Sequence, residues 1–345
     1  MNFSSLSEIA SYIVSDGKGI LAADESNPTC TKRFDSIGVE STEDNRRDYR
    51  ELLFRSEGMK GNIGGVILFD ETIRQTAADG TSLVDIITSQ GSIPGIKVDK
   101  GLQQIGDTEE SLTQGLEGLD ERLKEYYEIG AKFTKWRAVI SIGEGMPSSE
   151  AISANMEALA EYAKIVQNNN MVPMVEPEVL MDGNHSIDDC FEATSRCLDT
   201  LFACLLDKEV DIKGTILKPN LVLTGDKCSK KSDKKEIDEI SIYNSRFLID
   251  RNCKIIVVAC NTATTNSISK LRRKFKVPFI GIEPAIKPAA LNSKTKKVGV
   301  LATKGTLTSN LFFKTSSAHN TSATPFAIIY FLSLIHISRS RRKER

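Results

Sequence analysis

Short apolar runs alternate along the first two thirds of the chain with longer segments of helical period. The runs are bounded by glycine, proline or charged residues and cover residues 17–24, 64–70, 94–100, 131–137, 171–178 and 214–220. Amphipathic segments such as residues 150–168 and 187–207 lie between them. Strands that are apolar on both faces and alternate with helices are typical of a parallel sheet covered by helices, for which the barrel is the commonest closed form. The pattern therefore predicts an α/β fold with six βα units, an incomplete (β/α)8 TIM barrel.

Charged residues stand where each of these runs ends. They are Asp24, Asp70, Asp99 with Lys100, Lys135 with Arg137, Glu176 with Glu178, and Lys218. Strands often end in charge as they reach solvent, but in a barrel the carboxyl ends of all strands meet at one mouth. The pairs Lys97/Asp99, Lys135/Arg137 and Glu176/Glu178 are spaced by two, which places both members on one face of a strand. The sequence predicts a site of mixed acids and bases at the mouth.

Lys218 has the setting expected of a reactive amine. It follows the apolar run "GTIL" and precedes Pro219, so a buried strand delivers it to its carboxyl end. A lysine nucleophile must lose its proton near neutral pH, and because an ordinary lysine has a pKa of about 10.4 this requires desolvation or a cationic neighbour. Lys135 is the neighbour we expect, in a dry pocket. Glu176, with Glu178 beside it, offers the acid and base that carbinolamine dehydration needs, and Asp24 is available for a second substrate proton. These roles describe a Schiff-base lyase.

Composition narrows the class of partner and excludes a metal centre. The formal net charge of −1 over 345 residues gives no general attraction to nucleic acid or to an anionic membrane. Seven cysteines without a CxxC pair argue against a disulfide framework and a structural zinc site, and favour a reducing compartment. Metal-assisted cleavage would draw on several histidines, whereas the chain has three, of which only His185 lies among the βα units, in a "DGNHS" turn. We expect no metal and no cofactor.

Longer motifs in this region resemble those of class I fructose-bisphosphate aldolases. They are "GKGILAADES", "NRRDYRELLF", "GGVILFDETI", "GIKVDKG", "TQGLEGLDERLKEYYEIGAKFTKWRAV", "VPMVEPEVL" and "GTILKPNLV". The resemblance runs from about residue 5 to 231. It implies a metal-free enzyme of glycolysis that cleaves fructose 1,6-bisphosphate into dihydroxyacetone phosphate and glyceraldehyde 3-phosphate.

The resemblance also implies roles for individual residues. Lys218 matches the Schiff-base lysine, Lys135 the active-site lysine beside it, and Glu176 and Glu178 the catalytic glutamates. Asp24 matches the carboxylate that interacts near the substrate's C4 hydroxyl. Arg33, Lys97 and Arg137 match substrate-binding positions. The family continues for two further barrel strands that carry a Ser-Gly loop and an arginine for one substrate phosphate, and these are absent here. The open barrel would expose two strand edges, so we expect a marginal fold in which the catalytic lysine survives.

After Lys231 the spacing shortens. Runs at residues 254–260, 277–284 and 296–303 leave room for only a short helix such as residues 267–275, and a ninth strand has no place in an eight-stranded barrel. This spacing fits a partial doubly wound α/β segment. The motifs "IIVVACNTATTNSISKLRRKFKVPFIGIEPAIKP" and "KKVGVLATKGTLTSNLF" resemble glutamate racemase. Cys260 matches one of that family's two catalytic thiols, and the motif that carries the other is absent, so we expect no racemase activity.

These observations divide the chain into three parts. Residues 1–231 are expected to form a truncated aldolase barrel, 232–314 a racemase-like fragment, and 315–345 a tail that is disordered or non-native. The apolar run at residues 326–337 is too short to span a bilayer, although an anchor on a membrane surface is an alternative. The expected partner is a sugar phosphate, with no nucleic acid and no membrane, in the cytoplasm, and a homo-oligomer like the family's tetramer. A racemase fragment and a non-catalytic fusion product are the alternative readings.

Overall fold

The computed structural model describes residues 3–15, 17–35, 37–228, 234–250, 256–258, 261–281, 297–298 and 322–323. Its contacts divide the chain into two units, Met1–Lys230 and Lys231–Arg345. The first unit carries every described residue of the predicted site, whereas Cys260 lies outside the described residues.

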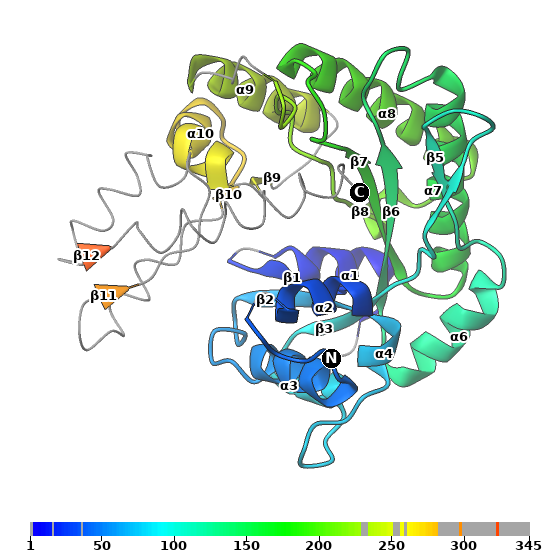
Figure 1. The fold of residues 1–345 in the computed structure, drawn as a ribbon, viewed down its shortest axis with the longest axis vertical. Coiled ribbons are helices and arrows are strands. Elements are labelled where there is room, and N and C mark those ends of the chain that lie inside the picture. Colours follow the sequence, from blue (N-terminus) through cyan, green and yellow to red (C-terminus); the bar gives the residue numbers. More distant parts are fainter. Residues whose placement is uncertain are drawn as a thin grey trace. The chain divides into compact units, whose positions relative to one another are not determined.

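A six-stranded sheet forms the centre of the first unit. Its strands are β1 (Gly19–Ala23), β2 (Ile63–Leu68), β3 (Ile93–Lys97), β6 (Phe133–Ile140), β7 (Val172–Val179) and β8 (Ile216–Leu217), which pair in that order. All neighbours are parallel, and helices lie around the curved sheet (Figure 1). Each strand overlaps a predicted apolar run; β1 and β8 lie inside theirs, and the other four extend beyond theirs by one to three residues. The prediction of an incomplete (β/α)8 barrel is confirmed.

Several helices of this unit begin at a serine or threonine whose side chain caps them. The helices of the unit are α1 (Leu6–Ile13), α2 (Asn27–Asp35), α3 (Glu43–Phe54), α4 (Asp70–Ile73), α5 (Leu83–Ser89), α6 (Leu119–Ile129), α7 (Ser149–Asn168) and α8 (Ile187–Asp207), with a short 3-10 helix η1 (Ile212–Gly214). The Ser148 side chain accepts from the Ala151 N–H at the start of α7, and Ser186 forms a capping box with Asp189 at the start of α8. The two helices predicted from periodicity, residues 150–168 and 187–207, are confirmed within one residue at each end.

Helix α1 closes the amino-terminal end of the sheet. Its buried residues Ile9, Ala10 and Ile13 pack on side chains near the starts of the strands, among them Phe133 and Val172. Burying these apolar groups stabilises the unit. The opposite, carboxyl-terminal end is left for polar side chains.

The sheet does not close on itself. β1 and β8 are its two ends, and β8 has only two residues, so no strand in the described part of the chain pairs with the outer edge of either. The structure also contains an antiparallel hairpin of β4 (Leu102–Gln104) and β5 (Ser111–Thr113), which the apolar pattern did not predict. β4 is exposed along its length, so it lacks the apolar run that marks the other strands.

The second unit contains a small parallel βαβ element. β9 (Ile256–Val258) pairs with β10 (Phe279–Gly281), and α10 (Asn261–Lys274) connects them. α9 (Lys234–Asp250) packs against α10. β11 (Lys297–Val298) pairs with β12 (Ser322–Ala323). We expected only a short helix at residues 267–275. The observed helix, α10, is longer because it begins at Asn261, six residues earlier. Apart from β12, the tail from residue 315 lies outside the described residues.

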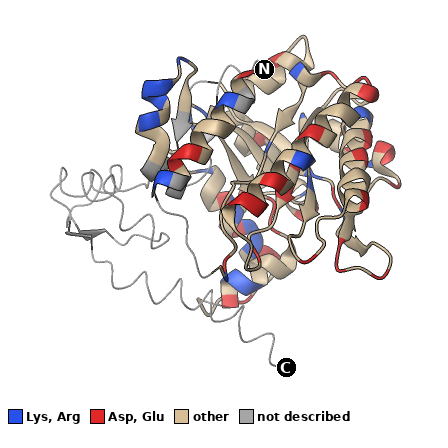
Figure 2. Cartoon of the chain, turned by 90° about the horizontal axis from the view of Figure 1, so that it is seen from above, with Lys and Arg blue, Asp and Glu red and all other residues tan. Residues whose placement is uncertain are grey.

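Charge is spread over the surface. Acidic and basic residues both occur on the helices that surround the sheet (Figure 2), consistent with a net charge near zero. Among the described residues, no helix is both long and apolar enough to cross a membrane.

Candidate active site at the carboxyl ends of the strands

Four side chains from four different strand ends meet in one connected cluster. Lys135, on β6, donates from Nζ to Asp24 Oδ2 at 2.8 Å, and the same nitrogen lies 3.2 Å from Glu176 Oε2 on β7. Lys218, which follows β8, donates to the other oxygen of Glu176, Oε1. Asp24 follows β1, so a carboxylate and an amine alternate from one end of the open sheet to the other.

Burial makes Lys135 and Glu176 the centre of this cluster. The side chains of Lys135 and Glu176 are 9% and 5% exposed. Burial acts to lower the pKa of Lys135, but the charges of Asp24 and Glu176 and the hydrogen bond to Asp24 outweigh it, so the pKa of Lys135 is raised. Lys135 therefore remains a cation at neutral pH, in contact with both carboxylates.

The environment of Lys218 differs from the expected dry pocket. Its side chain is 46% exposed. The reason is topological, since β8 is the last strand of the sheet and ends directly before Lys218. The expectation of desolvation is wrong for this structure, whereas the expected contact with Glu176 is present.

The two-residue spacings on β6 and β7 have the predicted consequence. Lys135 and Arg137 face the same side of β6, and they pair with Glu176 and Glu178 respectively. Arg137 Nε donates to Glu178 Oε2 in a half-exposed pair. This second pair extends the cluster outward along the same two strands.

The remaining predicted residues lie at the margins. At the end of β3, Lys97 Nζ lies 2.5 Å from Asp99 Oδ2. Lys97 is the register partner of Lys135 on the neighbouring strand, which places the Lys97 pair beside the cluster. Arg33, on α2, pairs with Glu25 and hydrogen-bonds to Tyr49 at 3.2 Å, but no contact joins it directly to Lys135 or Lys218 among the described residues. Arg33 is thus connected to the site through Glu25, the residue after Asp24.

Asp70 does not join the other strand-end charges. Its carboxylate accepts hydrogen bonds from Tyr126 at 2.8 Å and from Arg74 at 3.0 and 3.1 Å. Asp70 is the first residue of α4, so the helix and not strand β2 sets the direction of its side chain. The expectation that all of the strand-end charges converge is wrong for Asp70.

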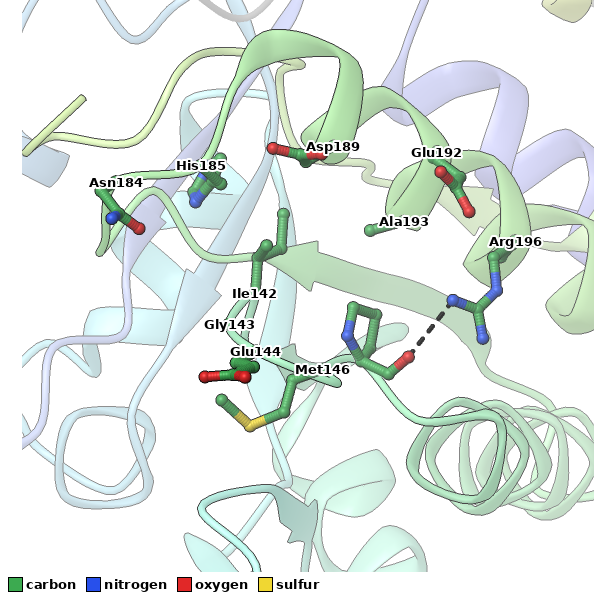
Figure 3. A pocket seen from close by; sticks show the side chains of 11 residues that line it. Ile142, Gly143, Glu144, Met146, Asn184, His185, Asp189, Glu192, Ala193 and Arg196 are labelled. Atoms are coloured by element: carbon green, nitrogen blue, oxygen red, sulfur yellow. Dashed lines mark hydrogen bonds between the residues drawn. The ribbon is translucent and has the colours of Figure 1, made fainter. Parts of the chain in front are cut away.

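His185 lines a separate pocket beside the loops after β6 and β7. The pocket has a volume of about 330 Å³ and lies between residues 142–147 and the start of α8 (Figure 3). His185 directly follows a bend at residues 183–184, within the turn that the sequence predicts, but it is only 6% exposed, which was not foreseen. Neither ring nitrogen has a hydrogen-bond partner among the described residues. Within that part of the chain, no three His, Cys, Asp or Glu side chains are grouped as metal ligands.

The sequence did not predict the buried arginine that hydrogen-bonds to the backbone on both sides of Asp24. Arg50, on α3, is 0% exposed and donates to the backbone carbonyls of Ala23 at 3.3 Å and Glu25 at 2.6 Å. In the sequence, Arg50 belongs to a charged helical stretch that looks like a solvated face. The "NRRDYRELLF" motif contained the signal, because Arg46 and Arg50 are four apart and therefore share one face of α3.

The arrangement of the strands agrees with comparisons to known proteins. The family model for class-I fructose-bisphosphate aldolase matches residues 5–256. A probable fructose-bisphosphate aldolase class 1 from Xanthomonas axonopodis pv. citri is 49% identical over 243 residues, which are 70% of this chain and 73% of that protein. The cytosolic fructose-bisphosphate aldolase 6 of Arabidopsis thaliana is 52% identical over 222 residues, which are 64% of this chain and 62% of that protein.

A solved structure and a second family model complete the comparison. The fructose-bisphosphate aldolase of Plasmodium falciparum, solved in a complex with TRAP and a small-molecule inhibitor, has a TM-score of 0.74 and 36% identity, covering 91% of this chain and 92% of that one. The model for Asp/Glu/Hydantoin racemase matches residues 237–325. With an aldolase match over most of its length, the chain belongs to the class I fructose-bisphosphate aldolase family.

Proposed function

We propose that this chain performs Schiff-base aldol chemistry on fructose 1,6-bisphosphate, with Lys218 as nucleophile. The observation that carries the proposal is the position of Glu176, whose two oxygens lie against the amines of Lys218 and Lys135. A carboxylate in contact with the attacking amine is placed to accept its proton. Lys218 is half-exposed, so burial does not remove its proton. In this mechanism the Lys218 amine is activated by direct transfer of its proton to Glu176.

The first half of the reaction follows from this contact. The free amine of Lys218 attacks the C2 carbonyl carbon, and the resulting carbinolamine must lose its hydroxyl as water. The proton taken by Glu176 is available for that hydroxyl. Glu176 Oε2 makes no hydrogen bond within the described part of the chain, but it lies 3.2 Å from Lys135 Nζ, which holds the carboxylate in place. Lys135 stays charged throughout and stabilises the anionic form of Glu176.

The second half breaks the C3–C4 bond. The iminium carbon draws in the electron pair of that bond as the C4 hydroxyl loses its proton. We assign that proton to Asp24, whose carboxylate is held 2.8 Å from Lys135. Glu178 with Arg137, together with Lys97 and Arg33, is assigned to the substrate's hydroxyl and phosphate groups. Of these, Lys97, Arg137 and Arg33 supply positive charge to phosphate oxygens.

The test is cleavage of fructose 1,6-bisphosphate by the full chain. Dihydroxyacetone phosphate and glyceraldehyde 3-phosphate should appear in equal amounts, and Lys218→Met should abolish both. Lys213→Met is a matched control, since Lys213 is an exposed lysine on η1 outside the cluster. No cleavage by the unaltered chain, or equal cleavage by Lys218→Met, would overturn the proposal.

For the rest of the chain we propose a fusion of two truncated folds. Residues 1–231 would form the aldolase part, 232–314 a racemase-like part without activity, and 315–345 an unassigned tail. The match to the racemase model over residues 237–325 supports the second part, and the presence of Cys260 without a second matching thiol motif supports its inactivity. The chain should therefore not exchange the α-proton of glutamate for deuterium in heavy water, and exchange would restore the racemase reading. Sequencing a single genomic or transcript read across residues 231 and 232 tests the fusion.

We further propose that the chain works in the cytoplasm, on a glycolytic substrate, as a homo-oligomer. The name of the cytosolic relative from Arabidopsis thaliana supports the compartment. The two unpaired sheet edges give an apolar, hydrogen-bonding surface that a second copy would cover. Light scattering of the purified full chain tests the oligomer, and a monomer at micromolar concentration would contradict it.

A further inference from the structure

Arg50 makes an unusual pair of contacts on either side of Asp24. Its Nε donates to the Ala23 carbonyl at 3.3 Å, and its Nη2 donates to the Glu25 carbonyl at 2.6 Å. One buried guanidinium therefore holds the backbone before and after the carboxylate that contacts Lys135. Such a fork of donors has a rigid geometry.

The backbone at this point has few other constraints. Ala23 is the last residue of β1, where the ladder with β2 ends. Buried carbonyls beyond a ladder need another donor, and Arg50 supplies it for both residues. The Asp24 carboxylate itself has only the hydrogen bond from Lys135 among the contacts of the described chain. Its direction is thus set by the backbone that Arg50 holds.

Arg50 also contacts Glu25 and Cys30, two residues that lie close to Arg33. Its Nη2 lies 3.9 Å from Glu25 Oε2, and the other oxygen of Glu25 pairs with Arg33. Glu25 is 10% exposed, so its carboxylate is nearly fixed between the two arginines. The same nitrogen of Arg50 lies 3.5 Å from Cys30 Sγ on α2, the helix that carries Arg33. Arg50 therefore connects α3, β1 and α2 directly beneath Asp24 and Arg33.

We propose that Arg50 is a positioning residue that orients Asp24 toward Lys135 by holding the carbonyls of residues 23 and 25. It touches no group that reacts, and it acts through the backbone of β1. This inference rests on the proposed function, because that function gives Asp24 its task in C3–C4 cleavage. A buried arginine that merely stabilises α3 would leave the Asp24 to Lys135 contact unchanged.

Arg46 provides a matched control on the same helix. It lies one turn before Arg50 and is also buried, and it donates to Glu71 through Nε at 2.8 Å and Nη2 at 2.6 Å. Its third contact is to the Ser41 carbonyl at 2.6 Å. Arg46→Met thus removes a buried arginine from α3 without removing a donor to β1. Arg50→Met removes the donors to β1, and Arg50→Lys keeps the buried charge with one nitrogen in place of the two that reach the carbonyls.

The direct readout is the titration of the Lys135 amine in the full chain, followed by nuclear magnetic resonance of 15N-labelled lysine side chains. The signal is assigned by its loss in Lys135→Arg. Asp24 is one of the charges that raise the pKa of Lys135, so displacement of Asp24 should move that titration to lower pH. We expect this shift in Arg50→Met, a smaller one in Arg50→Lys and none in Arg46→Met. In an Asp24→Asn background, Arg50→Met should add no further shift.

Each result decides the inference without any substrate. An unchanged Lys135 titration in the folded Arg50 variants would overturn it, as would an equal shift in Arg46→Met or a full further shift in the Asp24→Asn background. If Arg50→Met does not fold, Arg50→Lys decides alone. A chain that fails to cleave fructose 1,6-bisphosphate would refute the proposed function and leave this titration result standing. In a cleaving chain, we expect Arg50→Met to lower kcat by about 10- to 100-fold, the loss typical of a small misplacement.

Discussion

Lys135 and Asp24 are 111 positions apart in the chain, and the amine of Lys135, on β6, lies 2.8 Å from the carboxylate of Asp24, which directly follows β1. Two intervening strands, β2 and β3, separate β1 from β6 in the sheet. The contact therefore crosses the hollow face of the half-barrel. The sheet is curved by its parallel βα units and by α1. This curvature lets the buried Lys135 contact both Asp24 and Glu176.

Replacing Glu176 should show how much of the rate of imine formation depends on proton transfer from Lys218. In Glu176→Gln, Lys218 loses the group placed to accept its proton, so imine formation with dihydroxyacetone phosphate should slow by about 100- to 10,000-fold, the usual contribution of a general acid and base. The rate is measured by quenching samples with borohydride at increasing times. Glu178→Gln is the control, because Glu178 pairs with Arg137 and has no contact with Lys218 among the described residues. Equal rates in the two variants would contradict the assignment.

Lys135 should be important for stability as well as for chemistry. Lys135→Met leaves Asp24 without its cation beside the buried Glu176, which keeps only its contact with Lys218, so the free energy of unfolding should fall by about 3 to 5 kcal/mol. The fluorescence of Trp136, the one tryptophan of the chain, reports on this directly because it is fully buried on β6. Lys124→Met, which breaks an exposed pair with Asp120, should cost no more than about 1 kcal/mol. A similar cost in both variants would mean that the buried cluster is not stabilised by its charges.

The contribution of Lys135 should disappear at high pH. The pKa of Lys135 is raised in the folded state, so the stability it provides is fully present below the unfolded-state pKa of about 10.4 and is lost as pH rises through the higher folded-state value. The difference in free energy of unfolding between the unaltered chain and Lys135→Met should therefore be constant from pH 7 to about 10 and shrink above that. Denaturant titrations at each pH measure it. A difference that shrinks below pH 9 would show that the pKa of Lys135 is lowered instead.

Chelation should have no effect on imine formation. The iminium supplies the electron sink for C3–C4 cleavage, so the proposed mechanism needs no Lewis acid. Borohydride trapping in the presence of excess EDTA should proceed at the unaltered rate. A loss of trapping that added zinc restores would contradict the metal-free mechanism.

The packing beneath the site is tight at one glycine. A Cβ at Gly95, on β3, would come within 2.3 Å of the ring of Phe133 on β6, which is fully buried. Gly95→Ala should therefore lower the free energy of unfolding by about 1 to 3 kcal/mol. Gly19→Ala on β1 is the control, since the nearest atom to a Cβ there is 4.0 Å away. Trp136 fluorescence measures both, and a neutral Gly95→Ala would mean that the Phe133 ring moves freely.

Much of the fold could be predicted because the strands are short and apolar and each predicted run ends at or near a charged residue. Helices α7 and α8 were predicted from their helical period, and the caps Ser148 and Ser186 were recognised only in the structure. The hairpin of β4 and β5 was missed because its strands are three residues long and mostly polar, and a pattern that short has no distinct period.

The site was predicted as far as strand geometry determines it. Residues two apart on one strand share a face, so the spacing predicted the shared face of Lys135 with Arg137 and of Glu176 with Glu178. The pairing of the two strands' side chains with each other was seen only in the structure. The burial of Arg50 and His185 could not be foreseen, because a charged helix face and a polar turn look solvated in sequence. The exposure of Lys218 depends on which strand ends the sheet, a property of the whole topology.

The most direct test of Lys218 as the nucleophile is the site of covalent trapping. The full chain is incubated with dihydroxyacetone phosphate, reduced with borohydride, digested, and analysed by peptide mass spectrometry, with Lys135→Arg and Lys213→Met treated in the same way. The account predicts a reduced adduct on Lys218 and on no other lysine of the site. An adduct on Lys135 or Lys97, or no adduct at all, would contradict it.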